Sequence, residues 1–164
     1  MSISTEIKLM KKRFVIDTNA LIYYFYHIFN VSPQISSKGR SIINKALQDN
    51  SDYLIIIPSV VFVEIFDKWF RDNSNSNIGG EEFRARFISE VFIPIKNSPN
   101  IEIRELDKEV LETFLSLNDT YIKLENRDRI ILASAVVLNS YLITSDRKIK
   151  EYVEKYQIIP GIID

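Results

Sequence analysis

Apolar residues recur along the chain in two alternating patterns, one typical of β-strands and the other of helices. Residues 13–17 read as a buried strand that ends at an acid, and 53–57 are apolar at every position, as in a parallel sheet. "IEIRE" at 101–105 alternates apolar and polar residues and predicts a third strand. "YLITSD" at 141–146 predicts a fourth strand that also ends in an acid, and "IIPGI" at 158–162 predicts a last, short extended piece.

The segments between these strands have the apolar spacing of helices. We expect helices at about 20–29, 39–50, 59–70, 81–92, 108–117, 126–139 and 147–156. Strands that alternate with helices over the whole chain favour an α/β fold, with a mainly parallel sheet of about four to five strands and helices on both sides. We expect residues 1–164 to form a single domain, with a flexible loop near 71–80, where the chain is polar and rich in Asn, Ser and Gly.

Composition narrows the class of protein. Of the 164 residues, 46% are hydrophobic and 26% are charged, which is ordinary for a globular domain. No apolar run approaches the roughly 18 residues of a membrane span, and the opening segment lacks the apolar core of a secretion signal. The chain has no cysteine, which excludes disulfides, thiolate metal ligands and cysteine nucleophiles. We therefore expect a cytoplasmic protein without a membrane partner.

Charge and histidine content limit the chemistry further. The net charge of −1 at pH 7 argues against a chain covered with basic residues, so contacts with a nucleic acid would be local. His27 is the only histidine, whereas RNA cleavage without a metal often uses two histidines as acid and base. Hydrolysis by this chain would therefore depend on carboxylates, which suit hard cations. We assign no chemistry to His27.

Two predicted strands end in the same way. Asp17 follows the first strand and Asp146 follows the fourth, and ligands of open parallel sheets bind just beyond such strand ends. Each acid alone could equally be a turn or helix-cap residue. Together, two carboxylates at one edge of a sheet repel each other, and a divalent cation would compensate that repulsion directly.

Two further acids stand out from apolar surroundings. Glu64 is the only acid in "PSVVFVEIF", and a glutamate in such a helix is either exposed or functional, because a buried carboxylate needs a partner. Asp128 lies in the first turn of the helix that begins near Asn126. The simpler explanation for Asp128 is stabilisation of the helix dipole.

The chain carries, in this order, "VIDTN", a glutamate in the helix after the second strand, "RDRIILASA" and "YLITSD". This ordered set resembles the PIN-domain ribonucleases, and within them the VapC-type toxins of bacterial and archaeal toxin–antitoxin pairs. The resemblance spans roughly 13–150 and implies a compact three-layer α/β/α sandwich. The segment from about 71 to 96 is longer than in a minimal VapC-type toxin, which bears on the subfamily and on the partner surface.

The resemblance also implies which residues carry the chemistry. The acids that match the family's catalytic and metal-binding positions are Asp17, Glu64, Asp128 and Asp146. They would hold Mg²⁺ or Mn²⁺, which activates water for in-line attack on an RNA phosphodiester and leaves a 5′-phosphate and a 3′-hydroxyl. Asn19 and Thr144 match polar positions that support the acidic centre. Glu125 lies one helical turn before Asp128 and is an alternative ligand; the apolar run two residues after Asp128 favours Asp128.

Substrate and partner contacts follow from neighbouring residues and from the family. Basic residues beside two of the acids could contact RNA phosphates, or could be solvated charges at helix ends: Arg127, Arg129, Arg147 and Lys148. The aromatic residues between Tyr23 and Phe29 could stack on bases, but aromatic residues on a helix usually pack in a core or an interface. The family implies an RNA substrate, a homodimer, with the helix near Tyr23 as one candidate interface, and a cognate antitoxin if the protein is a toxin.

Other functions remain open from the sequence. A phosphatase that forms an aspartyl-phosphate also begins with an aspartate after the first strand, but it requires a second aspartate where this chain has Asn19. A PIN-like module without catalytic activity could bind RNA or protein. An RNA-processing enzyme that is not a toxin, or a DNA nuclease, could use the same metal centre.

Overall fold

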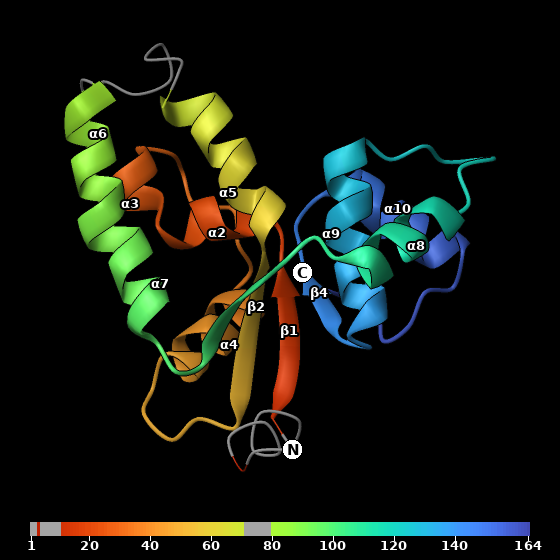
Figure 1. Ribbon diagram of the computed structural model, residues 1–164, viewed down its shortest axis with the longest axis horizontal. Helices are drawn as coiled ribbons and strands as arrows, with labels where there is room; N and C mark the ends of the chain where they lie inside the picture. The colour runs from red at the N-terminus through yellow and green to blue at the C-terminus, as the bar shows by residue number, and fades with distance from the viewer. Residues whose placement is uncertain (1–2, 4–10, 71–79) are drawn as a thin grey trace.

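The computed structural model describes residue 3 and residues 11–70 and 80–164 (Figure 1). The loop expected near 71–80 lies outside the described residues, except for Gly80, which begins a helix.

The centre of the described structure is a parallel sheet of five strands in the order β3-β2-β1-β4-β5. The strands are β1 (Lys12–Ile16), β2 (Tyr53–Pro58), β3 (Ile101–Arg104), β4 (Tyr141–Ile143) and β5 (Ile162–Ile163). In the register of the central strands, Phe14 lies opposite Ile55 on one side and Tyr141 on the other. The expected fold class, an α/β sandwich around a parallel sheet, is therefore confirmed.

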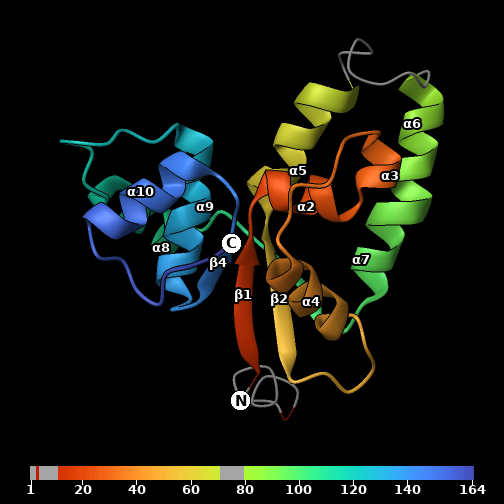
Figure 2. The same ribbon diagram turned by 180° about the vertical axis from the view of Figure 1, so that it is seen from behind.

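Helices connect the strands and lie on both sides of the sheet (Figures 1 and 2). The α-helices are α2 (Thr18–Tyr24), α3 (Tyr26–Phe29), α4 (Ser37–Ala46), α5 (Ser59–Ile65), α6 (Gly80–Phe87), α7 (Ile93–Asn97), α8 (Lys108–Ser116), α9 (Asn126–Val137) and α10 (Arg147–Lys155). Two π-helical segments, η1 (Phe66–Phe70) and η3 (Ile88–Phe92), continue α5 and α6. Helix α4 packs on β2, and α9 packs on β1, β2 and β4. Within the described ranges, no helix has the length and apolar content to cross a membrane.

The core follows from the apolar runs. The interior residues of β2, from Leu54 to Ile57, are all buried, as their uninterrupted apolar sequence predicts for a central parallel strand. Buried aromatic rings of α3, η1 and α6 belong to the same core. Among them is Phe83, whose ring lies 5.6 Å from that of Phe29 and 5.8 Å from that of Trp69.

Several predicted elements differ from the observed ones. The segment 20–29, expected as one helix, forms two helices. The break is at Phe25, which ends α2 and precedes α3. The helix expected at 81–92 runs on as α7 to Asn97. The fourth strand ends at Ile143 rather than at Asp146, because Thr144 and Asp146 form the turn into α10.

Candidate functional site

Asp17 lies between the end of β1 and the start of α2. Its backbone is extended and its Oδ1 accepts a hydrogen bond from the Ala20 amide at 2.7 Å, so the carboxylate caps the helix. The Asp17 amide donates to the carbonyl of Ile143, at 3.2 Å, which joins the ends of β1 and β4. Asp17 is only 3% exposed. The helix-cap explanation is therefore correct for Asp17, and the same geometry fixes a buried carboxylate at the carboxyl edge of the sheet.

Thr144 links this carboxylate to the next one. Its buried hydroxyl donates to Oδ2 of Asp17 and accepts a hydrogen bond from the Asp146 amide at 3.0 Å. Asp146 in turn caps α10, with Oδ1 accepting from the Ile149 amide at 2.9 Å. Asp17 and Asp146 thus each cap a helix that follows one of two neighbouring strands, and Thr144 is hydrogen-bonded to both residues.

Glu64 reaches the same edge of the sheet from α5. Its Oε2 accepts a hydrogen bond from the buried hydroxyl of Thr18 at 2.6 Å, and Thr18 follows Asp17 directly. Its Oε1 accepts from Nζ of Lys68 at 2.7 Å, one turn further along. The Glu64 side chain is 14% exposed and that of Lys68 is 50% exposed, so this ion pair lies at the rim of the site.

Asp128 lies in the first turn of α9, and Glu125 immediately precedes this helix without a side-chain hydrogen bond to its first turn. Both positions relative to the start of this helix were predicted from the sequence. Glu125 is exposed, whereas Asp128 is half-buried. Glu125, Lys123 and Lys148 line a hollow of about 450 Å³ beside this helix start.

The electrostatics show that the acids influence one another. Burial raises the pKa of Asp17 from 3.8 to about 7, and the negative charges of Asp146 and Asp128 add to the rise. The hydrogen bond from Thr144 acts on the pKa of Asp17 in the opposite direction. Burial also raises the pKa of Asp128 to about 6, and the charges of Asp146 and Glu64 act in the same direction. The four acids therefore form one cluster whose repulsion is not fully compensated.

Lys68 compensates part of this repulsion. Burial raises the pKa of Glu64, but the hydrogen bonds from Lys68 and Thr18, together with the charges of Lys68 and Arg127, outweigh it, so the pKa of Glu64 lies below its usual value. The positive charge of Lys68 also lowers the pKa of Asp128. The sequence interpretation overlooked Lys68, although its spacing of four residues from Glu64 on a predicted helix is a signal of pairing. It also overlooked Thr18, which no periodic pattern distinguishes.

The donor set can be compared with the needs of a divalent cation. The four side chains offer only carboxylate oxygens, which are the ligands that Mg²⁺ and Mn²⁺ prefer. In residues 11–70 and 80–164 no three acidic or histidine side chains are yet close enough together to hold an ion. Both oxygens of Asp17 accept hydrogen bonds, and so do both of Glu64. The residues fit a hard cation by chemistry and charge, provided that Glu64 exchanges Lys68 for the ion.

The remaining predicted site residues lie in different surroundings. Asn19 is partly buried in the first turn of α2, and its side chain makes no hydrogen bond to any described residue. Arg127 pairs with Asp67 of η1 at 3.0 Å. Lys148 is exposed, and Arg147 is 91% exposed and pairs with Glu151 at 2.8 Å.

The position of Arg129 does not agree with the RNA contact that the sequence suggested for it. It is 8% exposed, and its guanidinium donates to the carbonyls of Phe114 and Leu117 at 2.7 and 3.0 Å. Arg129 therefore fastens α9 to the end of α8, and its charge does not face the acids. A basic residue beside an acid in sequence projects from another side of the helix, so adjacency alone could not predict its direction.

The aromatic residues from Tyr23 to Phe29 pack mainly inward. Phe29 is fully buried, and Tyr23, Tyr24 and Phe25 are partly buried against the core. His27 is exposed and lies 4.0 Å from Glu90.

Comparisons with known proteins agree with this arrangement. The family profile of the PIN domain matches residues 14–155. No curated protein sequence matches the chain.

Three solved structures share the fold. VapBC2 from Rickettsia felis, bound to a DNA fragment from its promoter, has 16% identity and a TM-score of 0.60, with 93% of this chain and 99% of that chain covered. FitAcB from Neisseria gonorrhoeae has 13% identity and a TM-score of 0.61, with 92% and 96% covered. VapBC-1 from nontypeable Haemophilus influenzae has 14% identity and a TM-score of 0.58, with 93% and 97% covered.

Proposed function

The chain belongs to the PIN domain family, and from this membership and its acidic cluster we propose that it is a metal-dependent endoribonuclease. The observation that carries the proposal is the mutual effect of the four acids at the carboxyl edge of the sheet. The charges of Asp146 and Asp128 raise the pKa of Asp17, and those of Asp146 and Glu64 raise the pKa of Asp128. A site that concentrates carboxylates whose repulsion is only partly compensated is suited to a cation.

Four residues of the chain would hold the cation. They are Asp17, Glu64, Asp128 and Asp146. When bound, Mg²⁺ or Mn²⁺ activates water and neutralises the charge that develops on the phosphate. The hydroxyl of Thr144 holds Asp17 in place, and helix caps fix Asp17 and Asp146, so these ligands need little reorganisation.

Other side chains would position the RNA. Lys148, Arg147 and Arg127 lie within a few residues of Asp146 and Asp128 and would contact phosphates close to the cleaved bond. Asn19 lies in the first turn of α2, and its side-chain amide makes no hydrogen bond to a described residue. This amide would orient water or RNA. Water would attack the phosphorus in line with the P–O3′ bond; that bond breaks, the 3′ oxygen leaves and is protonated to a 3′-hydroxyl, and the phosphate stays on the 5′ oxygen.

We extend the proposal to the biological role. Two of the similar structures are named VapBC complexes, which supports a toxin of a type II toxin–antitoxin pair with a cognate antitoxin as its partner. A homodimer is also proposed, because the PIN-domain toxins that the chain resembles lead us to expect one. Expression of the wild-type chain should arrest bacterial growth, and co-expression of a small protein encoded beside it should restore growth. Growth that is unaffected by the active chain would contradict the toxin role without affecting the nuclease.

The nuclease is tested by the variant Asp17→Asn. Asparagine is nearly the same size and still caps a helix, so the fold should persist. Cleavage of a labelled RNA with Mg²⁺ or Mn²⁺ should fall at least a hundredfold, and chelator should abolish cleavage by the wild type. The exposed Asp49→Asn is the matched control and should cleave normally. Full activity of Asp17→Asn, or of the wild type in chelator, would contradict the mechanism.

One observation favours a second candidate, a PIN-like module that binds RNA or protein without cleaving it. Among the described residues no three acids are already arranged for a metal ion, and Lys68 occupies Glu64. Titration with Mn²⁺ separates the two candidates. Saturable binding that Asp17→Asn weakens supports the enzyme, and an absence of binding at millimolar Mn²⁺ supports the module.

A further inference from the structure

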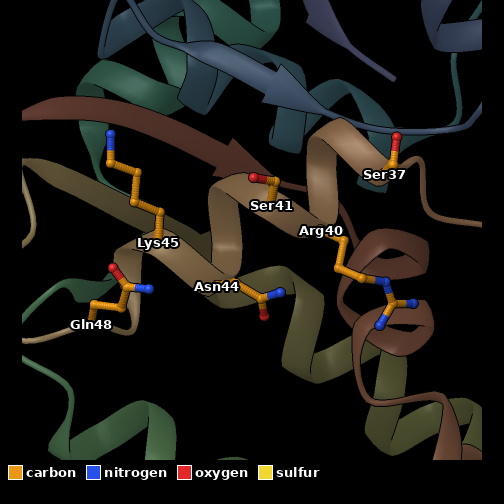
Figure 3. A pocket seen from close by; sticks show the side chains of 6 residues that line it. All are labelled: Ser37, Arg40, Ser41, Asn44, Lys45 and Gln48. Carbon is orange, nitrogen blue, oxygen red and sulfur yellow. The ribbon is translucent and has the colours of Figure 1, made fainter.

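A groove with several positive charges runs along α4 and reaches the amino ends of β1, β2 and β4. Two adjoining hollows, of about 430 and 450 Å³, share Ser41 and Lys45 of α4. Figure 3 shows the first hollow, where side chains project from α4 and Lys45 extends toward β1. We call the combined surface the α4 groove and define it by its charged and aromatic residues: Lys12, Lys38, Arg40, Lys45, Tyr53 and Tyr141.

The cations of the α4 groove are poorly neutralised. Lys12, Lys38 and Arg40 form no ion pair with any residue that the structure describes, and Lys45 is 3.8 Å from the exposed Asp52. The chain as a whole has a net charge of −1, so this concentration of cations is local. A local cluster of this kind is the electrostatic mark of a phosphate-binding surface.

Aromatic rings form the floor of the groove. Phe14 of β1 lies between Tyr53 of β2 and Tyr141 of β4, with ring centroids 5.1 and 6.2 Å apart. Nζ of Lys45 lies 4.2 Å from the Tyr53 ring, and Nζ of Lys12 lies 5.4 Å from the Tyr141 ring. Both tyrosines are partly exposed. Rings that can stack on bases, placed beside lysines that can reach phosphates, are the combination that binds single-stranded nucleic acid.

Polar groups on α4 complete the surface. Oδ1 of Asn44 accepts a hydrogen bond from the Tyr24 hydroxyl at 2.7 Å, which leaves the Asn44 amide nitrogen as a donor. Ser37, Ser41 and Gln48 line the same hollow and are exposed. Donors of this kind suit phosphate and sugar oxygens.

The part of the groove around Lys12 lies at the other end of β1 from the acids, whereas α4 runs back toward their edge of the sheet, where Gly39 lies close to Ile143. Lys12 begins the strand, and Asp17 follows its last residue five positions later. At about 3.3 Å per residue, the two residues are roughly 17 Å apart. A ligand beside Lys12 is therefore separate from the bond cleaved at the acids, and only an extended ligand can contact both.

We propose that the α4 groove binds single-stranded RNA several nucleotides away from the cleaved bond. That this RNA is the substrate rests on the proposed nuclease function. Binding itself does not depend on catalysis.

The test measures binding of a fluorescein-labelled 12-nucleotide oligouridylate by fluorescence anisotropy, with the full chain in chelator so that no cleavage occurs. The variant Lys38→Gln/Lys45→Gln should bind at least tenfold more weakly than the wild type. The slope of log K against log salt should become shallower by about 1.4, which is about 0.7 for each cation removed from a single-strand site. The matched control Lys96→Gln/Lys108→Gln removes two exposed charges from α7 and α8 and should bind as the wild type does.

A second variant tests stacking separately from charge. Tyr141→Leu should weaken binding between about fivefold and a hundredfold, with an unchanged salt slope, because it removes a ring and no charge. Circular dichroism and the Tm of each variant establish that it is folded.

The proposal is overturned if the wild type does not bind the oligouridylate, or if the lysine variant binds within twofold of it. Equal weakening in the control, or tighter binding of a duplex DNA of the same length, would also overturn it. RNA that is bound but never cleaved contradicts the nuclease alone. Cleavage by the wild type, with binding unaffected in the lysine variant, contradicts the groove alone.

Discussion

At the scale of single residues, Asp17 combines structural and chemical roles. It caps α2, accepts a hydrogen bond from Thr144 and remains almost completely buried. Keeping a carboxylate charged in such a place costs free energy, since burial disfavours the charged form. That cost is the reason to expect a cation, and it can be measured without any assay of activity.

The first prediction concerns the pH dependence of stability. Because the folded pKa of Asp17 is raised from 3.8 to about 7, the folded state binds this proton more tightly than the unfolded state. Its contribution to stability is complete below about pH 4 and is lost as pH rises through 7; Asp128, with a pKa of about 6, acts in the same direction. In chelator, calorimetry should therefore give a higher Tm at pH 5 than at pH 8.

Two controls make this result specific. Mg²⁺ should raise the Tm at pH 8 and not at pH 5, where Asp17 is protonated. Asp17→Asn should flatten the pH dependence and be more stable than the wild type at pH 8. A wild-type Tm that does not fall between pH 5 and pH 8, or a variant with the same pH profile, would contradict the account.

The second prediction concerns Lys68, whose ammonium group neutralises Glu64. Replacement by methionine, Lys68→Met, keeps the apolar stem and removes the charge that competes with a cation. The affinity for Mn²⁺ should rise roughly tenfold, because a positive charge a few ångströms from the site is lost. Isothermal titration calorimetry measures this, with Lys96→Met as the control. Weaker Mn²⁺ binding by Lys68→Met would instead mean that Lys68 holds Glu64 in position for the metal.

At the scale of elements, the position of η1 matters to the site. It carries Lys68 at the rim of the acids, Asp67 against Arg127, and the buried Trp69. The rings of Phe83 and Trp69 are stacked with centroids 5.8 Å apart, so α6 packs against η1. Packing of the aromatic cluster therefore determines where Lys68 lies.

The third prediction follows from this packing. Phe83→Ala removes a fully buried ring and should lower the free energy of unfolding by about 3–5 kcal/mol. Phe83→Leu should lower it less, since it keeps most of the volume. Urea titrations followed by the fluorescence of Trp69, the single tryptophan, measure both. Equal stabilities of Phe83→Ala and the wild type would show that the cluster does not support η1.

The elements also show where sequence reasoning succeeded and where it stopped. Periodicity located the strands and most helices, because burial on one or both faces leaves a direct pattern. It missed the break at Phe25 and the π-helical turns, which no residue type marks. The cap at Asp107 was predicted correctly because capping has a chemical signature. The helix starting at 126 was predicted correctly from its apolar pattern.

At the scale of the whole molecule, parallel strand order is what gathers the acids. β1 and β4 are neighbours although more than a hundred residues separate them in sequence, so Asp17 and Asp146 share Thr144. Sequence order together with the family pattern was enough to select these residues; their roles as ligands stay a prediction. The α4 groove could not be predicted, because its lysines and tyrosines come from four separate segments.

The fourth prediction concerns the proposed single domain. One sheet contacts helices on both sides, so residues 1–164 should unfold in one cooperative transition. The calorimetric and van't Hoff enthalpies should then be equal. Two separable transitions would contradict a single domain.

The central claim is most directly tested by crystals of the full chain grown with Mn²⁺ and examined for anomalous scattering. The account predicts a peak within coordinating distance of carboxylate oxygens of Asp17 and Asp146, with Asp128 or Glu64 completing the site and Lys68 displaced from Glu64. A map at saturating Mn²⁺ with no peak among these acids, or with Lys68 still bound to Glu64 and the metal elsewhere, would contradict it.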